Sequence, residues 1–408
     1  MTSLDATRGV GFDLLDNPPA EFIEEMRRRY PTERETDELL VRKLRRRGQP
    51  PYRPVSLDQL RQGLEALLSE KLSGSFEVVN ARWFTGGASK IQMGFDLRWE
   101  DPVRGPSTDR MMLRMDPAES HNATSRLREY ELLKAFEGVI PVPPAYWVDE
   151  EARHFPEPVL IYGFIDGVTK PRRTATGQVS GMGTNFGTGL RERLARQFIE
   201  HLAAIHTLDT TTAGFTSMDQ PELGTQQAAL WQLNRARRVW EEDRGEDLPL
   251  MEVAANWLER NAPVLDHVSV VHGDYRSGNF LFEEDTGRVT GWLDWERGHL
   301  GDRHRDLSWT TQLFAGHYDE DGTYLVCGLV PLDTFYEEYE RRSGLTVDPE
   351  RLRWYRVLNA YQVIASTLGT AYRVVRLGKT HQDILLARVE GVWPTVAAEL
   401  ATLLEEVL

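Results

Sequence analysis

Apolar positions near the start of the chain recur at helical spacing, three or four residues apart. Ser56 and Gln59 have the spacing of a capping box at a helix N-terminus. The apolar face that follows them is formed by Leu57, Leu60, Leu64, Leu67 and Leu68. A second helical pattern covers "ETDELLVRKLRRRG" (35–48), and we interpret its arginine run at 45–47 as a solvated helix end rather than a phosphate-binding or partner-binding patch. We therefore predict a helical N-terminal extension over residues 1–73.

Beyond the extension, apolar and polar positions alternate as they do in strands. The stretch "SFEVVNARWFTGGASKIQMGFDLRWE" (75–100) is typical of two strands joined by a glycine-containing turn, and "DRMMLRM" (109–115) of a third strand. A helical pattern follows at 123–138, and "PEPVLIYGFIDG" (156–167) is typical of a buried strand that ends at a break. The order strand, strand, strand, helix, strand, strand predicts a small antiparallel sheet with one helix, which we assign to residues 74–165.

The remaining part of the chain, residues 166–408, is mostly helical in pattern. It opens with a Gly/Ser/Thr-rich segment at 170–189, which we predict to be a long loop. The stretch "LRERLARQFIEHLAAIHTL" (190–208) is strongly periodic, so we interpret His206 on it as a core histidine and not a metal ligand. Three tryptophans of this part are also predicted to lie in the core: Trp292, Trp295 and Trp309.

Composition limits the classes of function. The chain has 408 residues, 40% hydrophobic and 27% charged, with a net charge of −15, so a nucleic-acid-binding role is disfavoured. Its single cysteine, Cys327, allows no internal disulfide and indicates a reducing, cytoplasmic setting. No apolar run is long enough to span a membrane, and the N-terminus lacks the apolar stretch of a signal peptide. The oligomeric state stays open.

The stretch "VVHGDYRSGNFLF" (270–282) places polar residues between two short apolar runs, a pattern typical of a loop between strands. Asp274 and Asn279 lie on this loop, and Asp294 and Glu296 follow in "WLDWE". This layout matches the phosphoryl-transfer template, in which the first acid orients a substrate hydroxyl and accepts its proton. The amide and the second acid of that template hold Mg²⁺ against the nucleotide phosphates.

The motifs "HGDYRSGNFLF" and "GWLDWERGHLGDRHRDLSW" resemble those of the aminoglycoside phosphotransferase and choline-kinase-like family. The resemblance covers roughly residues 75–400. It implies an α+β, bilobal, protein-kinase-like fold with a small antiparallel-sheet lobe and a larger helical lobe. It also implies a small-molecule kinase that uses ATP and Mg²⁺ and acts on a hydroxyl group. GTP stays open as an alternative donor, because main-chain groups would bind the base.

The resemblance assigns roles to residues of the helical lobe. Asp274 would be the catalytic base, and Asn279 and Asp294 would be metal ligands. Glu296 would hold a second metal or support the first one. His272 would brace the loop.

The same resemblance assigns nucleotide-binding roles to the sheet lobe. The loop in "FTGGASK" would cover the phosphates through the backbone N–H groups of Gly86, Gly87, Ala88 and Ser89. Arg114 would contact phosphate and pair with Glu129, in the position where the resistance kinases have a lysine. The hinge that binds the base would be formed by Gly163, Phe164 and Ile165.

Two other functions stay open at this point. A metal-dependent hydrolase could use imidazole and carboxylate groups to hold a transition metal. The candidates for it are His272, Asp274, His299, His304 and Asp306. This alternative explains neither Asn279, nor the small sheet, nor the Arg114–Glu129 pair. A pseudokinase acting as a binding module is the other alternative, because Arg114 departs from the usual lysine.

The acceptor is the least determined part of the prediction. An acidic chain, with "HYDEDGT" at 317–323, would suit a cationic acceptor such as an aminoglycoside or choline. The motifs are nevertheless closest to those of kinase domains appended to some acyl-CoA dehydrogenases, for which the implied substrate class is hydroxyacyl-CoA. We therefore favour a metabolic hydroxyl compound over an aminoglycoside.

Overall fold

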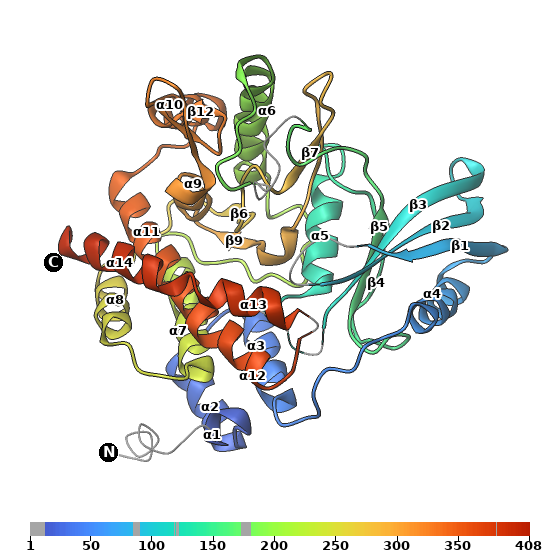
Figure 1. Ribbon diagram of the computed structural model, residues 1–408, viewed down its shortest axis with the longest axis horizontal. Coiled ribbons are helices and arrows are strands. Elements are labelled where there is room, and N and C mark those ends of the chain that lie inside the picture. The colour runs from blue at the N-terminus through green and yellow to red at the C-terminus, as the bar shows by residue number, and fades with distance from the viewer. Residues whose placement is uncertain (1–12, 85–89, 118, 120–121, 173–180, 381) are drawn as a thin grey trace.

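The computed structural model describes residues 13–84, 90–117, 119, 122–172, 181–380 and 382–408. Figure 1 shows a sheet on one side of the molecule and a larger, mainly helical part on the other. The predicted α+β, two-lobed fold class is confirmed. The predicted boundaries of the N-terminal extension (1–73), the sheet lobe (74–165) and the helical lobe (166–408) stay a prediction.

The smaller lobe is built on a five-stranded sheet in which every neighbouring pair is antiparallel. In spatial order its strands are β1 (Phe76–Trp83), β2 (Ile91–Asp101), β3 (Gly105–Met115), β5 (Val159–Gly163) and β4 (Ala145–Asp149). Helix α5 (Arg126–Phe136) lies between β3 and β4 in the sequence, so the predicted order of elements is confirmed.

The two faces of this sheet bury different partners because side chains alternate along each strand. Odd-numbered residues of β2 and β3, such as Met93 and Leu113, share a core with the leucines of helix α4 (Leu57–Lys71). Even-numbered residues, including Met112 and Arg114, point away from α4 toward the helical lobe. The alternation seen in the sequence therefore decides which side chains can reach a ligand between the lobes.

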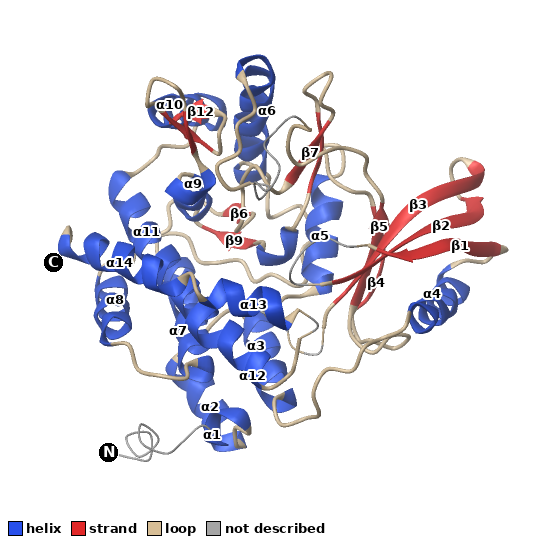
Figure 2. Ribbon diagram, viewed as in Figure 1, coloured by secondary structure: helices blue, strands red, loops and turns tan. Residues whose placement is uncertain are grey.

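The larger lobe surrounds short strands with helices, as Figure 2 shows. Its helices are α6 (Thr188–His206), α7 (Gln227–Asp243), α8 (Pro249–Arg260), α9 (His304–Thr310), α10 (Leu332–Ser343), α11 (Pro349–Ile364), α12 (Tyr372–Arg376), α13 (Asp383–Glu390) and α14 (Trp393–Glu405), with the short turns η1 (Trp295–Arg297) and η2 (Leu313–Ala315) and the π-helical segment η3 (Ala365–Ala371). Its strands pair as β6 (Ser269–Val271) with β9 (His299–Gly301), as β7 (Phe280–Phe282) with β8 (Val289–Trp292), and as β10 (His317–Tyr318), β11 (Tyr324–Val326) and β12 (Val330–Pro331). No helix of the described residues is long and apolar enough to cross a bilayer.

The N-terminal helices attach to both lobes. Helices α1 (Asp13–Asp16), α2 (Ala20–Arg29) and α3 (Arg34–Arg46) lie against the larger lobe, where α3 packs on α7, whereas α4 packs on the sheet. The capping box predicted for α4 is confirmed, since Ser56 accepts from the Gln59 amide and Gln59 accepts from the Ser56 amide.

Our interpretation of the arginine run at 45–47 is wrong for its last residue. The side chain of Arg47 is fully buried, and it forms an ion pair with Asp243, the last residue of α7. Arg46 bonds Glu157 in the sheet lobe, with Nη1 2.6 Å from Oε2. Helical periodicity could not reveal this burial, because the partners lie more than a hundred residues away in the sequence.

Candidate active site

A cleft of about 400 Å³ lies between the sheet and the helical lobe. Phe164 and Ile165, two of the three residues predicted to form the hinge, line it. Polar and aromatic groups from both lobes line it: Gln92, Arg114, Glu129, Tyr162, Asn279, Asp294 and Trp295. Segments far apart in the sequence therefore meet at one concave site.

The loop after β6 is fixed by its own backbone. The N–H groups of His272 and Gly273 donate to the two carboxylate oxygens of Asp306, at 2.6 and 2.8 Å. Gly273 has a positive φ of 81°, and a Cβ there would lie 2.8 Å from the Cβ and the carbonyl oxygen of Arg297. Only glycine meets both requirements without strain. Asp306 thus has a structural position, since its carboxylate holds the loop backbone.

His272 and His206 complete the support of this loop. His272 Nε2 lies 3.1 Å from the carbonyl oxygen of Leu293, which joins the loop to the "WLDWE" segment. His206 is fully buried, between the Tyr339 hydroxyl and Asp306, as expected of a core histidine. Burial alone would raise the pKa of Asp306, but the hydrogen bond and charge of His206 lower it below its usual value. Asp306 therefore stays ionised and keeps accepting from the loop.

Three donors hold the Asp274 carboxylate. Arg276 Nε and Trp309 Nε1 donate to Oδ1 at 2.9 and 2.6 Å, and Asn279 Nδ2 donates to Oδ2 at 2.7 Å. Sequence analysis missed Arg276 and placed Trp309 only in the core. Trp309 is indeed buried, but its indole N–H reaches Asp274 across 35 residues of sequence. An ionised carboxylate held in one orientation can accept a proton from a hydroxyl group that lies within hydrogen-bond distance of it.

Asn279 connects the two predicted metal-binding segments. Its Nδ2 also donates to the Asp274 carbonyl oxygen at 2.7 Å, so its side-chain oxygen is left to accept or to coordinate. Its own carbonyl oxygen accepts from the Leu293 amide at 2.8 Å, one residue before Asp294. Asp294 itself has the left-handed backbone conformation, with φ of 65°, which is uncommon for a residue with a Cβ.

Arg114 is the centre of the charge network in the cleft. It forms the predicted ion pair with Glu129, with Nη1 2.8 Å from Oε1. Its Nη2 lies 2.7 Å from Asp294 Oδ1 and 2.6 Å from Glu296 Oε2. Burial opposes the charge of Arg114, but these three carboxylates raise its pKa above the ordinary value. The guanidinium thus stays charged while it holds both lobes together.

Lys90 and Arg126 form a second layer that the sequence analysis did not identify. Lys90 Nζ is fully buried, 2.9 Å from Asp116 Oδ1 and 3.6 Å from Glu296 Oε2. Arg126 forms an ion pair with Glu129 from one turn earlier on the same helix. Glu296 therefore lies between two cations, which suits a supporting role beside a metal site better than direct coordination.

The donor set fits a hard divalent cation. Burial, then the charge of Glu296, raises the pKa of Asp294, and the nearby Asp274 adds to this rise. A cation bound to the Asn279 oxygen and the Asp294 carboxylate would relieve that repulsion, and oxygen ligands of this kind suit Mg²⁺. Among the described residues there is no group of three His, Cys, Asp or Glu side chains that could hold a metal ion.

The remaining predicted nucleotide contacts differ in how far the structure describes them. Gly86, Gly87, Ala88 and Ser89 lie outside the described residues. At the hinge, the Gly163 amide donates to the carbonyl oxygen of Pro144 at 2.8 Å, and the Phe164 amide donates to the carbonyl oxygen of Arg110 at 2.9 Å. Of the three hinge amides, that of Ile165 is the one without a partner in the described part of the chain, so it is the one available to a nucleotide base.

Comparison with known proteins assigns the family. The sequence profile of the phosphotransferase enzyme family matches residues 100–355, which include the hinge, the Asp274 loop and the "WLDWE" segment. The chain belongs to this family. It is therefore a phosphotransferase enzyme, and the suspected resemblance is confirmed.

The curated relatives of this phosphotransferase are of two kinds. Acyl-CoA dehydrogenase family member 10 from Mus musculus is 22% identical over 345 residues, which cover 80% of this chain and 30% of that protein. Aminoglycoside 3'-phosphotransferase from Streptomyces fradiae is 31% identical over 120 residues, which cover 28% of this chain and 42% of that protein. The phosphotransferase thus spans less than half of the length of either relative.

Solved structures support the fold of the phosphotransferase. A provisionally named aminoglycoside phosphotransferase from Ralstonia eutropha JMP134 has a TM-score of 0.60 at 21% identity, covering 85% of this chain and 98% of that one. Macrolide 2'-phosphotransferase type I has a TM-score of 0.51 at 18% identity, covering 82% of this chain and 98% of that one. At such identities the likeness establishes architecture and leaves the acceptor open.

Proposed function

We propose that this phosphotransferase transfers the γ-phosphoryl group of ATP to a hydroxyl group of a small molecule in the cytoplasm. The observation that carries the proposal is the set of three donors that holds the Asp274 carboxylate. One of them, Asn279, lines the cleft together with Asp294. The buried, unpaired thiol of Cys327 is in keeping with a reducing compartment. GTP is the alternative donor.

In this proposal Asp274 orients the acceptor hydroxyl and takes its proton. Arg276, Trp309 and Asn279 keep the carboxylate from rotating, so little reorganisation is needed when the hydroxyl loses its proton. Asn279 and Asp294 would hold Mg²⁺, which supplies charge neutralisation at the phosphate oxygens when bound. Arg114, held by Glu129, is directed to the phosphates from the sheet.

The proposed acceptor is a metabolic hydroxyl compound rather than an aminoglycoside. Support comes from the motifs and from the relatives named as acyl-CoA dehydrogenase family members, which are matched over most of this chain. A pseudokinase role is disfavoured because the acids and the amide of the template are all present in one site.

The proposal is tested by measuring ATP consumption in the presence of aminoglycosides, choline-like amines, sugars and hydroxyacyl compounds. We expect turnover that needs Mg²⁺ and a hydroxyl acceptor, and a phosphorylated product visible by mass spectrometry. Tight ATP binding with no turnover across the whole panel would instead favour a binding module. Efficient phosphorylation of an aminoglycoside alone would overturn the preferred acceptor but not the activity.

A further inference from the structure

Three arginines lie together beside the Asp274 loop, and we name Arg235, Arg297 and Arg305 the arginine cluster. Arg235 lies on α7, Arg297 is the last residue of η1, and Arg305 lies in the first turn of α9. Each therefore comes from a different element of the larger lobe. Strand β9 lies between η1 and α9 in the sequence, and α7 packs directly against β9. Among the described residues, no carboxylate forms an ion pair with any of the three.

Trp309 connects the cluster to the proposed base. The guanidinium carbon of Arg297 lies 5.0 Å from the centre of the Trp309 ring, and that of Arg305 lies 6.0 Å from it. The edge of the same indole donates to Asp274 at 2.6 Å. The cluster is thus one side chain away from the carboxylate that would accept the hydroxyl proton.

Arg305 shows that the cluster lacks a charged partner among the described residues. Its side chain is only 2% exposed, and neither Nε nor Nη1 has a hydrogen-bond partner among the described residues. Its Nη2 donates to the Gln362 amide oxygen, which is uncharged. A buried guanidinium with two unpaired nitrogens is costly unless a ligand completes it.

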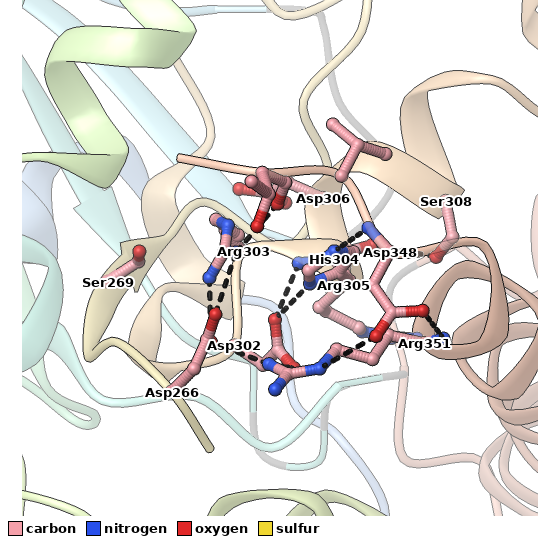
Figure 3. A network of polar contacts seen from close by, with 12 residues as sticks. Asp266, Ser269, Asp302, Arg303, His304, Arg305, Asp306, Ser308, Asp348 and Arg351 are labelled. Carbon is pink, nitrogen blue, oxygen red and sulfur yellow. Dashed lines mark hydrogen bonds and ion pairs between the residues drawn. The ribbon is translucent and has the colours of Figure 1, made fainter. Parts of the chain in front are cut away.

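Neighbouring arginines of the same region are paired in the ordinary way. In Figure 3, Arg303 and Arg351 are both joined to Asp266 by dashed lines, at 2.8 and 2.6 Å, close to Arg305. The lack of a carboxylate is therefore specific to the cluster and not a property of this part of the fold.

The charges around the cluster leave it positive. Burial, then the charge of Arg297, lowers the pKa of Arg235 to about 10 and that of Arg305 to about 9, so both stay protonated at neutral pH. Two nearby carboxylates are already used: Glu33 bonds Arg128 at 2.8 Å, and Glu296 bonds Arg114.

We propose that the arginine cluster binds an anionic group of the acceptor, a carboxylate or a phosphate, while the acceptor hydroxyl faces Asp274. Guanidinium groups bind both kinds of oxyanion through paired N–H donors. This inference rests on the proposed function and specifies its acceptor class. It runs opposite to what the net charge of −15 suggests, because recognition depends on the charge at the site and not on the chain total.

The first experiment measures binding without nucleotide, by titration calorimetry, so that it does not depend on phosphoryl transfer. The ligands are matched pairs: 3-hydroxyhexanoate and its methyl ester, glycerol 3-phosphate and glycerol, and 3-hydroxybutyryl-CoA and the corresponding pantetheine thioester. We expect the charged member of at least one pair to bind about 10-fold or more tightly. The pairs distinguish carboxylate from phosphate recognition. Equal binding within every pair, or a preference for kanamycin, would overturn the inference.

The second experiment removes the charges one at a time. Arg297→Gln and Arg305→Gln should each weaken binding of the charged member about 10- to 100-fold and leave the uncharged member unchanged. Arg297→Lys should retain part of the preference. Arg237→Gln, on the same helix as Arg235 but paired with Glu259 at 3.0 Å, is the control that should change nothing.

The variants separate this inference from the proposed function. If Arg305→Gln does not fold, the partly exposed Arg297 still carries the test. An unchanged preference for the anion in Arg297→Gln would overturn the role of the cluster. Selective anion binding by a chain that never consumes ATP would overturn the proposed activity only, whereas ATP turnover confined to uncharged acceptors would overturn the inference only.

Discussion

At the scale of single residues, an arginine at position 114 changes what the proposed phosphate-contacting position can do. A lysine there would offer one compact charge, whereas the planar guanidinium contacts Glu129, Asp294 and Glu296 at the same time. Arg114 thus links the helix of the small lobe to the proposed metal-binding segment of the large lobe. The departure from lysine is compatible with catalysis for this reason.

We expect Arg114→Ala to raise the apparent KM for ATP about 10- to 100-fold, because a charge-assisted contact to phosphate is lost. Steady-state kinetics with varied ATP measure this, and Arg98→Ala, an exposed ion-paired arginine on β2, is the control. If the variant binds ATP as tightly as the parent, Arg114 is structural only.

Asp274 gives the second prediction at this scale. Asp274→Asn keeps the size and most hydrogen bonds of the side chain but cannot accept a proton, so turnover should fall about 10²- to 10⁴-fold. ATP affinity, measured separately by calorimetry, should stay close to that of the parent. Asp333→Asn, an exposed residue of α10, serves as the control. Near-normal turnover by Asp274→Asn would refute its role as base.

At the scale of elements, the local signals were the most reliable. The capping box at Ser56 begins α4 where the sequence placed it, and the apolar face of that helix packs on the sheet. Alternation in the strands predicted their existence, and in the structure it separates a core face from a cleft face. These features depend on neighbours within a few residues, so they can be recognised without the tertiary structure.

The capping box leads to a stability prediction. Ser56→Ala removes the side-chain acceptor for the Gln59 amide and should lower the free energy of unfolding by about 1 kcal/mol. Urea denaturation measures the change. Ser69→Ala, on the exposed last turn of the same helix, removes a hydroxyl that bonds only a helix carbonyl and should have a much smaller effect. Equal losses in the two variants would contradict a capping role.

The site residues that the sequence analysis missed are held by contacts between positions far apart in the sequence. Trp309 bonds Asp274, and Lys90 approaches Glu296 from more than two hundred residues away. Neither contact leaves a periodic or local trace, because the first depends on packing within the large lobe and the second on packing between the lobes. The residues of this chain could be matched one by one to the positions of a family motif. The side chains that hydrogen-bond to those residues could not be identified in this way.

At the scale of the whole molecule, a buried ion cluster fastens the N-terminal helices to the large lobe. Asp243 is fully buried and pairs with both Lys43 and Arg47 from α3. Burial alone would raise the pKa of Asp243, but the two cations lower it below the usual 3.8. The cluster therefore depends on the ionised carboxylate.

Asp243→Ala should lower the free energy of unfolding by about 3–5 kcal/mol, because it removes the buried carboxylate that pairs with both Lys43 and Arg47. Since the folded pKa is depressed, the stabilisation is present above the ordinary carboxyl pKa and declines as the pH falls below it. Denaturation of the parent and the variant at neutral and acidic pH measures both effects. The exposed Glu246→Ala is the control. A stability difference that does not shrink on acidification would contradict this account.

The attachment of α3 also changes how the sheet lobe is connected. The chain leaves the large lobe after Arg47, passes Gly378, whose carbonyl oxygen accepts from the Tyr52 amide at 2.8 Å, enters the sheet lobe at α4 and returns through the hinge. The sheet lobe is therefore connected to the large lobe by two chain segments, one before α4 and one at the hinge. Two connections at different places restrict rotation of the lobe more than the hinge alone would. A protease cut between residues 50 and 55 would reduce the two chain connections to one, the hinge. The ion pairs Arg46–Glu157 and Arg114–Asp294 would still join the sheet lobe to the rest of the molecule, so we expect nucleotide entry and product release to depend on them and on the hinge.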